Sequence, residues 1–152
     1  RVWSCLAVVG DHLPVELHLK KTVGRMATYL QAYGDLMVKT NQWNPSYLSK
    51  FRDSEIIKNF QGAIDQKASF QELEVIKELI PNSWLSNAAL GTPKECVYEI
   101  NKQFDLGCDG VILHGVSPQE LLPVVEEYKR QRETKRFSHL PNNPALPPSM
   151  CA

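Results

Sequence analysis

The chain opens with an apolar run at residues 2–9 (VWSCLAVV) that is rich in β-branched side chains. An unbroken apolar run of this length predicts a strand buried on both faces, as in a parallel sheet. From Leu13 onward the apolar positions recur at helical spacing, which predicts a helix to about Gln31 that stops near Gly34. The inward-facing residues of this helix are expected to be Leu19, Val23, Met26, Ala27 and Leu30.

The middle of the chain predicts helices that follow one another without an intervening strand. Asn44-Pro45-Ser46 is typical of a helix start, and a further helix is expected from Ser69 to Pro81. Residues 42–82 are therefore predicted to be a helical insertion. Its apolar inner positions are Tyr47, Leu48, Phe51, Ile56, Ile57, Phe60, Leu73, Ile76, Leu79 and Ile80.

A repeat follows the insertion, because "AALGTPKECVYEI" and "ILHGVSPQELLPV" share one pattern. Each has an apolar strand, a glycine, a Ser or Thr, a proline, and a glutamate that opens an amphipathic helix. Thr92 and Ser117 are predicted to cap the helices, each contributing about 1 kcal/mol. Glu95 and Glu120 complete two capping boxes, and each proline stands at the first helical position, where a missing N–H costs little.

Two consecutive strand–glycine–helix units predict parallel strands with right-handed crossovers, so candidate ligand residues gather at the carboxyl ends of the strands. Gly91-Thr92 opens a helix whose free N–H groups are able to hold an anion, and Gly115 allows close approach of a ligand. His114 and Asp11 stand at the same edge and are candidates to line a pocket. Structural roles explain the same residues: Thr92 as a cap, His114 as a strand end bonded to a neighbouring loop, and Asp11 as a turn residue.

The segments "GTPKE", "LGCDGVIL" and "SPQEL", in that order and with 24 residues between Gly91 and Gly115, resemble the C-terminal end of the luciferase-like monooxygenase family. "KKTVGRMATYLQ" is similar to the deazaflavin-linked branch of that family. The resemblance covers about residues 1–133. It implies an α/β fold that forms the C-terminal part of a (βα)8 TIM-type barrel, with about three parallel strands and a helical insertion. The partial barrel is expected over residues 1–134, and a proline-rich tail over residues 135–152.

The resemblance implies a flavin- or deazaflavin-dependent oxidoreductase that acts on a small organic substrate. Gly91, Thr92 and Gly115 would lie near an FMN or deazaflavin coenzyme, and His114 and Asp11 near the substrate. A full barrel needs about 250 residues, whereas this chain has 152. The first units and most of the cofactor site are therefore expected to be missing, so that the chain is inactive alone and forms a homo-oligomer or joins the rest of a barrel. The alternative is a non-catalytic α/β interaction module that dimerises through its open sheet.

The charge balance, the apolar segments and the cysteine spacing bear on which partners the chain is expected to bind. The chain has 17 basic and 17 acidic residues, so no net field favours nucleic acid or an anionic membrane. No segment approaches the roughly 20 apolar residues that a membrane helix needs. The four cysteines are scattered, without metal-ligand spacing, which favours reduced thiols in a cytoplasmic protein that binds no metal.

Overall fold

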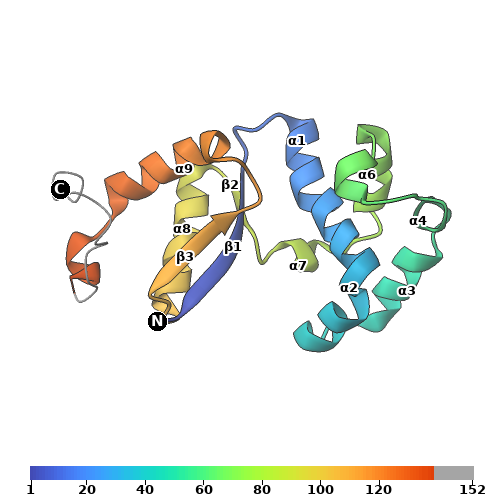
Figure 1. The fold of residues 1–152 in the computed structure, drawn as a ribbon, viewed down its shortest axis with the longest axis horizontal. Helices are drawn as coiled ribbons and strands as arrows, with labels where there is room; N and C mark the ends of the chain where they lie inside the picture. The colour runs from blue at the N-terminus through green and yellow to red at the C-terminus, as the bar shows by residue number, and fades with distance from the viewer. Residues whose placement is uncertain (139–152) are drawn as a thin grey trace.

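A computed structural model describes residues 1–138 and contains a small parallel sheet of three strands (Figure 1). The strands are β1 (Trp3–Gly10), β2 (Ala89–Gly91) and β3 (Gly110–His114). Both pairings are parallel. The predicted α/β class and the predicted parallel strands are therefore confirmed.

The sheet has the order β2-β1-β3, and it is open within the described residues. The long strand β1 pairs with β3 along its first part, from Trp3 to Ala7, and with β2 along its last part, from Val8 to Gly10. Strands that are consecutive in a barrel lie next to each other, so a barrel segment would have the order β1-β2-β3. Here β2 and β3 are the two edges of the sheet.

One face of the sheet is covered by α8 (Pro93–Asp105) and α9 (Pro118–Gln131). Both predicted capping boxes are present, since each N-cap hydroxyl accepts from the backbone N–H of the glutamate and each carboxylate accepts from the N-cap N–H. The helices bury an apolar layer on the sheet. This layer consists of Leu6, Val8, Ala89, Cys96, Val97, Ile100 and Val124, with Phe104, Val111, Leu113, Leu121 and Tyr128 around it.

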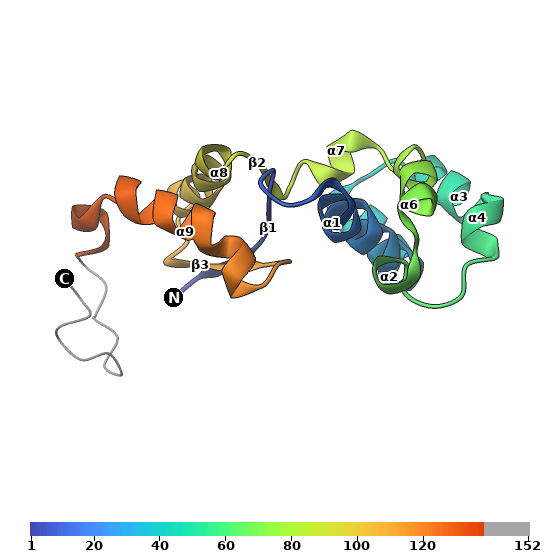
Figure 2. The same ribbon diagram turned by 90° about the horizontal axis from the view of Figure 1, so that it is seen from above.

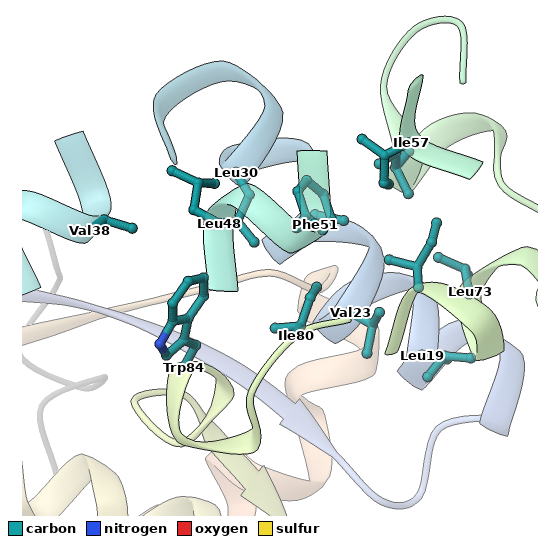
Figure 3. Packing of buried hydrophobic residues seen from close by; sticks show 13 residues of the cluster. Leu19, Val23, Leu30, Val38, Leu48, Phe51, Ile57, Leu73, Ile80 and Trp84 are labelled. Carbon is teal, nitrogen blue, oxygen red and sulfur yellow. The ribbon is translucent and has the colours of Figure 1, made fainter. Parts of the chain in front are cut away.

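Residues 15–85 form a helical unit at the other end of the elongated molecule (Figure 2). Its core is a single apolar cluster, in which Phe51 and Leu48 of one helix pack near Leu30 of another (Figure 3). The unit therefore begins before the expected insertion at residues 42–82 and includes the first predicted helix. Its elements are α1 (Val15–Leu19), the π-helical turn η1 (Lys20–Gly24), α2 (Arg25–Asn41), α3 (Pro45–Asp53), α4 (Glu55–Lys58), α5 (Ile64–Lys67), α6 (Phe70–Lys77) and α7 (Asn82–Leu85).

The expected stop near Gly34 is wrong, because α2 continues to Asn41. The backbone leaves helical angles at Tyr33 (φ −133°, ψ 17°) and then resumes. Gly34 itself is buried against α3, and a Cβ at this position would lie 2.7 Å from a methyl group of Leu48. The glycine therefore permits close helix packing instead of ending the helix.

The strand β1 is not buried on both faces along its whole length, as its apolar run predicted. Leu6 and Val8 are buried under the helices, but Cys5 on the opposite face is exposed, and Trp3 is 58% exposed. An apolar run shows that a strand can be covered on both faces; whether it is covered depends on segments distant in the sequence.

The start of the expected tail is ordered against α8. A 3-10 turn, η2 (Thr134–Phe137), places the Arg136 guanidinium 2.8 Å from the Asp105 carboxylate. The Phe137 ring packs edge-on against Phe104, with 4.9 Å between ring centroids. Residues 139–152 of the expected tail lie outside the described residues.

Candidate functional site

A cavity of about 350 Å³ lies between the uncovered face of the sheet and the helical unit. This volume is at the lower end of the range of small-molecule sites. One wall is β1, with β2 and β3 beside it, and the opposite wall is formed by η1, α2 and α7. The cavity is the candidate functional site because it is where the two parts of the fold meet around an open space.

The sheet wall follows from strand alternation. On β1 the side chains of Cys5, Ala7 and Val9 face the cavity, whereas the residues between them face α8 and α9. Ala7 is in register with His114 of β3, and Val9 is in register with Leu90 of β2. His114 therefore lies beside a small residue, on the open face of the sheet.

The helical wall presents Lys21, Arg25 and Tyr29, which stand four residues apart along η1 and α2. This spacing places three polar or aromatic side chains on one side of the helix. The helix buries Val23 and Ala27 in the core of its own unit. The π-helical turn contains Lys21, and such turns are frequent at functional sites.

Two tryptophans form the aromatic part of the cavity wall. The indole rings of Trp43 and Trp84 stack with 4.3 Å between centroids and 9° between planes. Tyr47 packs edge-on against Trp84, at 6.1 Å. Trp84 also belongs to the core of the helical unit (Figure 3), and Trp43 packs against that core, so both rings contribute to packing as well as to the cavity wall.

Lys21 connects the helical unit to the loop after β3. Its Nζ donates to the carbonyl oxygen of Gly115 at 3.2 Å and lies 3.3 Å from the Glu120 carboxylate. The same carboxylate accepts from the backbone N–H of Ser117. These contacts hold the pKa of Glu120 below its usual range, first through the Ser117 backbone and then through Lys21. His12 adds a contact between its ring Nε2 and the Glu120 carbonyl oxygen, 2.8 Å apart.

His114 is half-buried, and desolvation lowers its pKa, with the positive charge of Arg25 lowering it further. Both effects favour the neutral imidazole. Gly115 follows with φ +106°, and a Cβ there would lie 3.4 Å from the Arg25 guanidinium. His114 and Gly115 thus meet Lys21 and Arg25 at one corner of the cavity, which is called the cationic corner below.

Gly115 and the other three predicted site residues, Gly91, Thr92 and Asp11, are not among the residues that line the cavity. Gly91 has φ +101°, and its carbonyl oxygen accepts from the Asp11 N–H at 2.8 Å. The Thr92 N–H donates to the Glu95 carboxylate at 2.7 Å, so the capping box uses one of the donors proposed for an anion. Asp11 is exposed. Of the five predicted residues, His114 lines the cavity and Gly115 lies next to it, against Lys21 and Arg25, and the ligand roles of all five stay predictions.

Sequence reasoning did not select Lys21, Arg25 or Tyr29. Their spacing was the available signal, because a polar stripe on a helix with a separate apolar stripe indicates a second functional face. The sequence does not show which element this polar face contacts, because the contact joins residues more than 90 positions apart, such as Lys21 and Gly115.

Within residues 1–138 there is no group of three or more His, Cys, Asp and Glu side chains arranged to hold a metal ion. The same residues include no helix with the length and apolarity that a membrane span requires. Comparisons with protein-family models, with curated proteins and with solved structures gave no match.

Proposed function

We propose that this chain is the C-terminal portion of a luciferase-like, flavin- or deazaflavin-dependent oxidoreductase or monooxygenase that acts on a small organic substrate. The bare sheet face with its cavity supports this proposal most directly. In a barrel enzyme helices cover the outer face of the strands, side chains of the inner face fill the interior, and the reaction site lies at the carboxyl ends of the strands. The sheet here has α8 and α9 on one face, and Val9, Leu90 and His114, near the carboxyl ends of β1, β2 and β3, line a cavity on the other.

The lining suits a flat ring. The sheet contributes small and apolar side chains, Ala7, Val9 and Leu90, on which the ring would lie. The bound ring would supply hydride transfer or oxygenation, and these residues would orient it and exclude water. Gly91 and Thr92 do not line the cavity, so the cofactor's remaining groups would need residues from elsewhere.

The strand order sets a condition on the proposal. In a closed barrel β3 would pair with β2. For this chain to form part of such a barrel, β3 would therefore have to separate from β1. The bare face and the cavity, and not the strand order, therefore support the function. Alone, the chain is expected to bind cofactor weakly and to turn over no substrate.

Riboflavin and 5-deazariboflavin test the ring site, because both carry the ring without a phosphate. Quenching of tryptophan emission should saturate with a weak affinity, in the high-micromolar to millimolar range, and should be lost in Ala7→Phe, which fills the cavity. Ala32→Phe adds the same ring at an exposed position of α2 and serves as the matched control. Absence of saturable quenching, or equal quenching in Ala7→Phe, would contradict the ring site. Tight binding by this chain alone would contradict the need for further barrel units.

The second candidate is a non-catalytic interaction module that dimerises through its sheet. Its supporting observation is that β2 and β3 are both open edges within residues 1–138 and that Ile112 on β3 is 50% exposed. Sedimentation of the wild-type chain over a range of concentrations tests it. A stable monomer at high concentration would count against this module.

A further inference from the structure

The cavity lining includes positive and aromatic side chains. Lys21 and Arg25 lie beside Gly115 and His114 at the cationic corner, and the stacked Trp43 and Trp84 rings form another part of the wall. No Asp or Glu side chain lines the cavity within residues 1–138. The lining therefore carries positive charge with no negative charge of its own.

The two cations differ in how they are neutralised. Lys21 is engaged by the Glu120 carboxylate at 3.3 Å and by the Gly115 carbonyl oxygen at 3.2 Å. Arg25 takes part in none of the ion pairs or side-chain hydrogen bonds formed within residues 1–138. Its side chain is half-buried and lies next to Gly115 and His114.

A half-buried guanidinium without a partner is unusual, because desolvation of a charge is costly unless a counter-charge or hydrogen bonds offset it. The Glu120 carboxylate, which contacts Lys21 of the same helix face, is already held by Lys21 and by the Ser117 N–H. Asp11 is exposed and does not line the cavity. Arg25 therefore lines the cavity with five N–H donors, and no side-chain hydrogen bond or ion pair within residues 1–138 engages them.

We infer that the cavity binds a small organic oxyanion with a flat apolar body, its anionic group on Arg25 and its body against the wall of Trp43 and Trp84. Guanidinium geometry matches carboxylate and phosphate oxygens in pairs, so both groups fit this description. Neutral His114 beside Arg25 can donate or accept one further hydrogen bond according to its tautomer. This inference rests on the proposed function, since it names the chemical class of the substrate for the same cavity.

Naphthalene derivatives test the inference without any flavin ring. The probes are 2-naphthoate, 2-naphthyl phosphate and neutral 2-naphthamide, titrated into the wild-type chain by calorimetry. A charge-assisted pair with Arg25 is expected to make the carboxylate bind about tenfold tighter than the amide. Comparison of the carboxylate with the phosphate shows which oxyanion the site prefers, and a preference for either over the amide supports the inference.

The variants locate the effect. Arg25→Gln should reduce the carboxylate-over-amide preference to about twofold or less, and Arg25→Lys should keep part of it. Lys50→Gln removes the same charge from an exposed position of α3 and should leave the preference unchanged. Equal binding of anion and amide by the wild type, binding of neither, or an unchanged preference in Arg25→Gln would overturn the inference. If Arg25→Gln fails to fold, the wild-type ligand pair and Arg25→Lys still decide it.

The two proposals fail separately. Loss of riboflavin binding with retained anion preference would remove the flavin function and leave the oxyanion site. Riboflavin binding without a preference for the anionic naphthalene ligands would remove the oxyanion site and leave the flavin function. Ala7→Phe should weaken all ligands together, because it removes the shared space.

Discussion

The contact between Lys21 and Glu120 is expected to hold the helical unit against the sheet, and its coupling energy can be measured. The two side chains are 18% and 23% exposed, and their charged atoms are 3.3 Å apart. At an effective dielectric constant of about 20, the Coulomb attraction at this distance is about 5 kcal/mol. Desolvation of both partly buried groups offsets most of this energy, so the net coupling is expected to be about 1 kcal/mol.

A double-mutant cycle of Lys21→Met and Glu120→Gln isolates this energy. Methionine keeps the apolar stem of Lys21, and glutamine keeps the capping box on Ser117 because it can still accept the same N–H. The free energy of unfolding of the wild type, both single variants and the double variant is measured by urea denaturation.

The exposed pair of Lys58 and Asp53, 3.7 Å apart, provides the control cycle through Lys58→Met and Asp53→Asn. Its coupling should stay below about 0.5 kcal/mol and should vanish in salt. A Lys21–Glu120 coupling below about 0.3 kcal/mol, or one equal to that of the control, would refute the reasoning that burial strengthens this pair.

Three further predictions concern stability and reactivity. Phe51→Ala should lower the free energy of unfolding by about 3–5 kcal/mol, since its side chain is fully buried; a loss below about 1 kcal/mol in urea denaturation would contradict the described core. Burial lowers the pKa of His18 and His114, so the unfolded chain binds more protons as the pH falls. Stability should therefore be complete above about pH 6.5 and decline from there toward pH 5, and His18→Asn with His114→Asn should flatten this decline in urea midpoints. Burial raises the pKa of Cys96 to about 11, so iodoacetamide at pH 8 should modify exposed Cys5 and leave Cys96 intact in the folded chain; equal labelling of both by mass spectrometry would contradict this.

Local rules were enough to predict the strands and the last two helices. The apolar runs at residues 2–9 and 110–114 form β1 and β3, and Thr92 and Ser117 begin α8 and α9 with complete capping boxes. These signals act within four residues, so they can be read directly from the chain.

Features set by distant contacts could not be predicted in the same way. Gly34 looked like a helix stop, because a glycine that ends a helix and a glycine that admits a neighbouring helix look alike in a sequence. The central place of β1 follows from how its two halves pair with β2 and β3, which no local signal specifies. The cationic corner needs Arg25 of α2 to meet the end of β3, and only the folded arrangement places them together.

The central claim is that the cavity between the bare sheet face and α2 is a ligand site. Amide-resolved NMR of the isotope-labelled chain, titrated with riboflavin, tests it most directly. Saturable shifts are expected at Ala7, Leu90 and His114 on the sheet and at Arg25 on α2, with Tyr98 on the exposed side of α8 unchanged. Shifts that gather around Tyr98, or that spread evenly over the chain without saturating, would contradict the account.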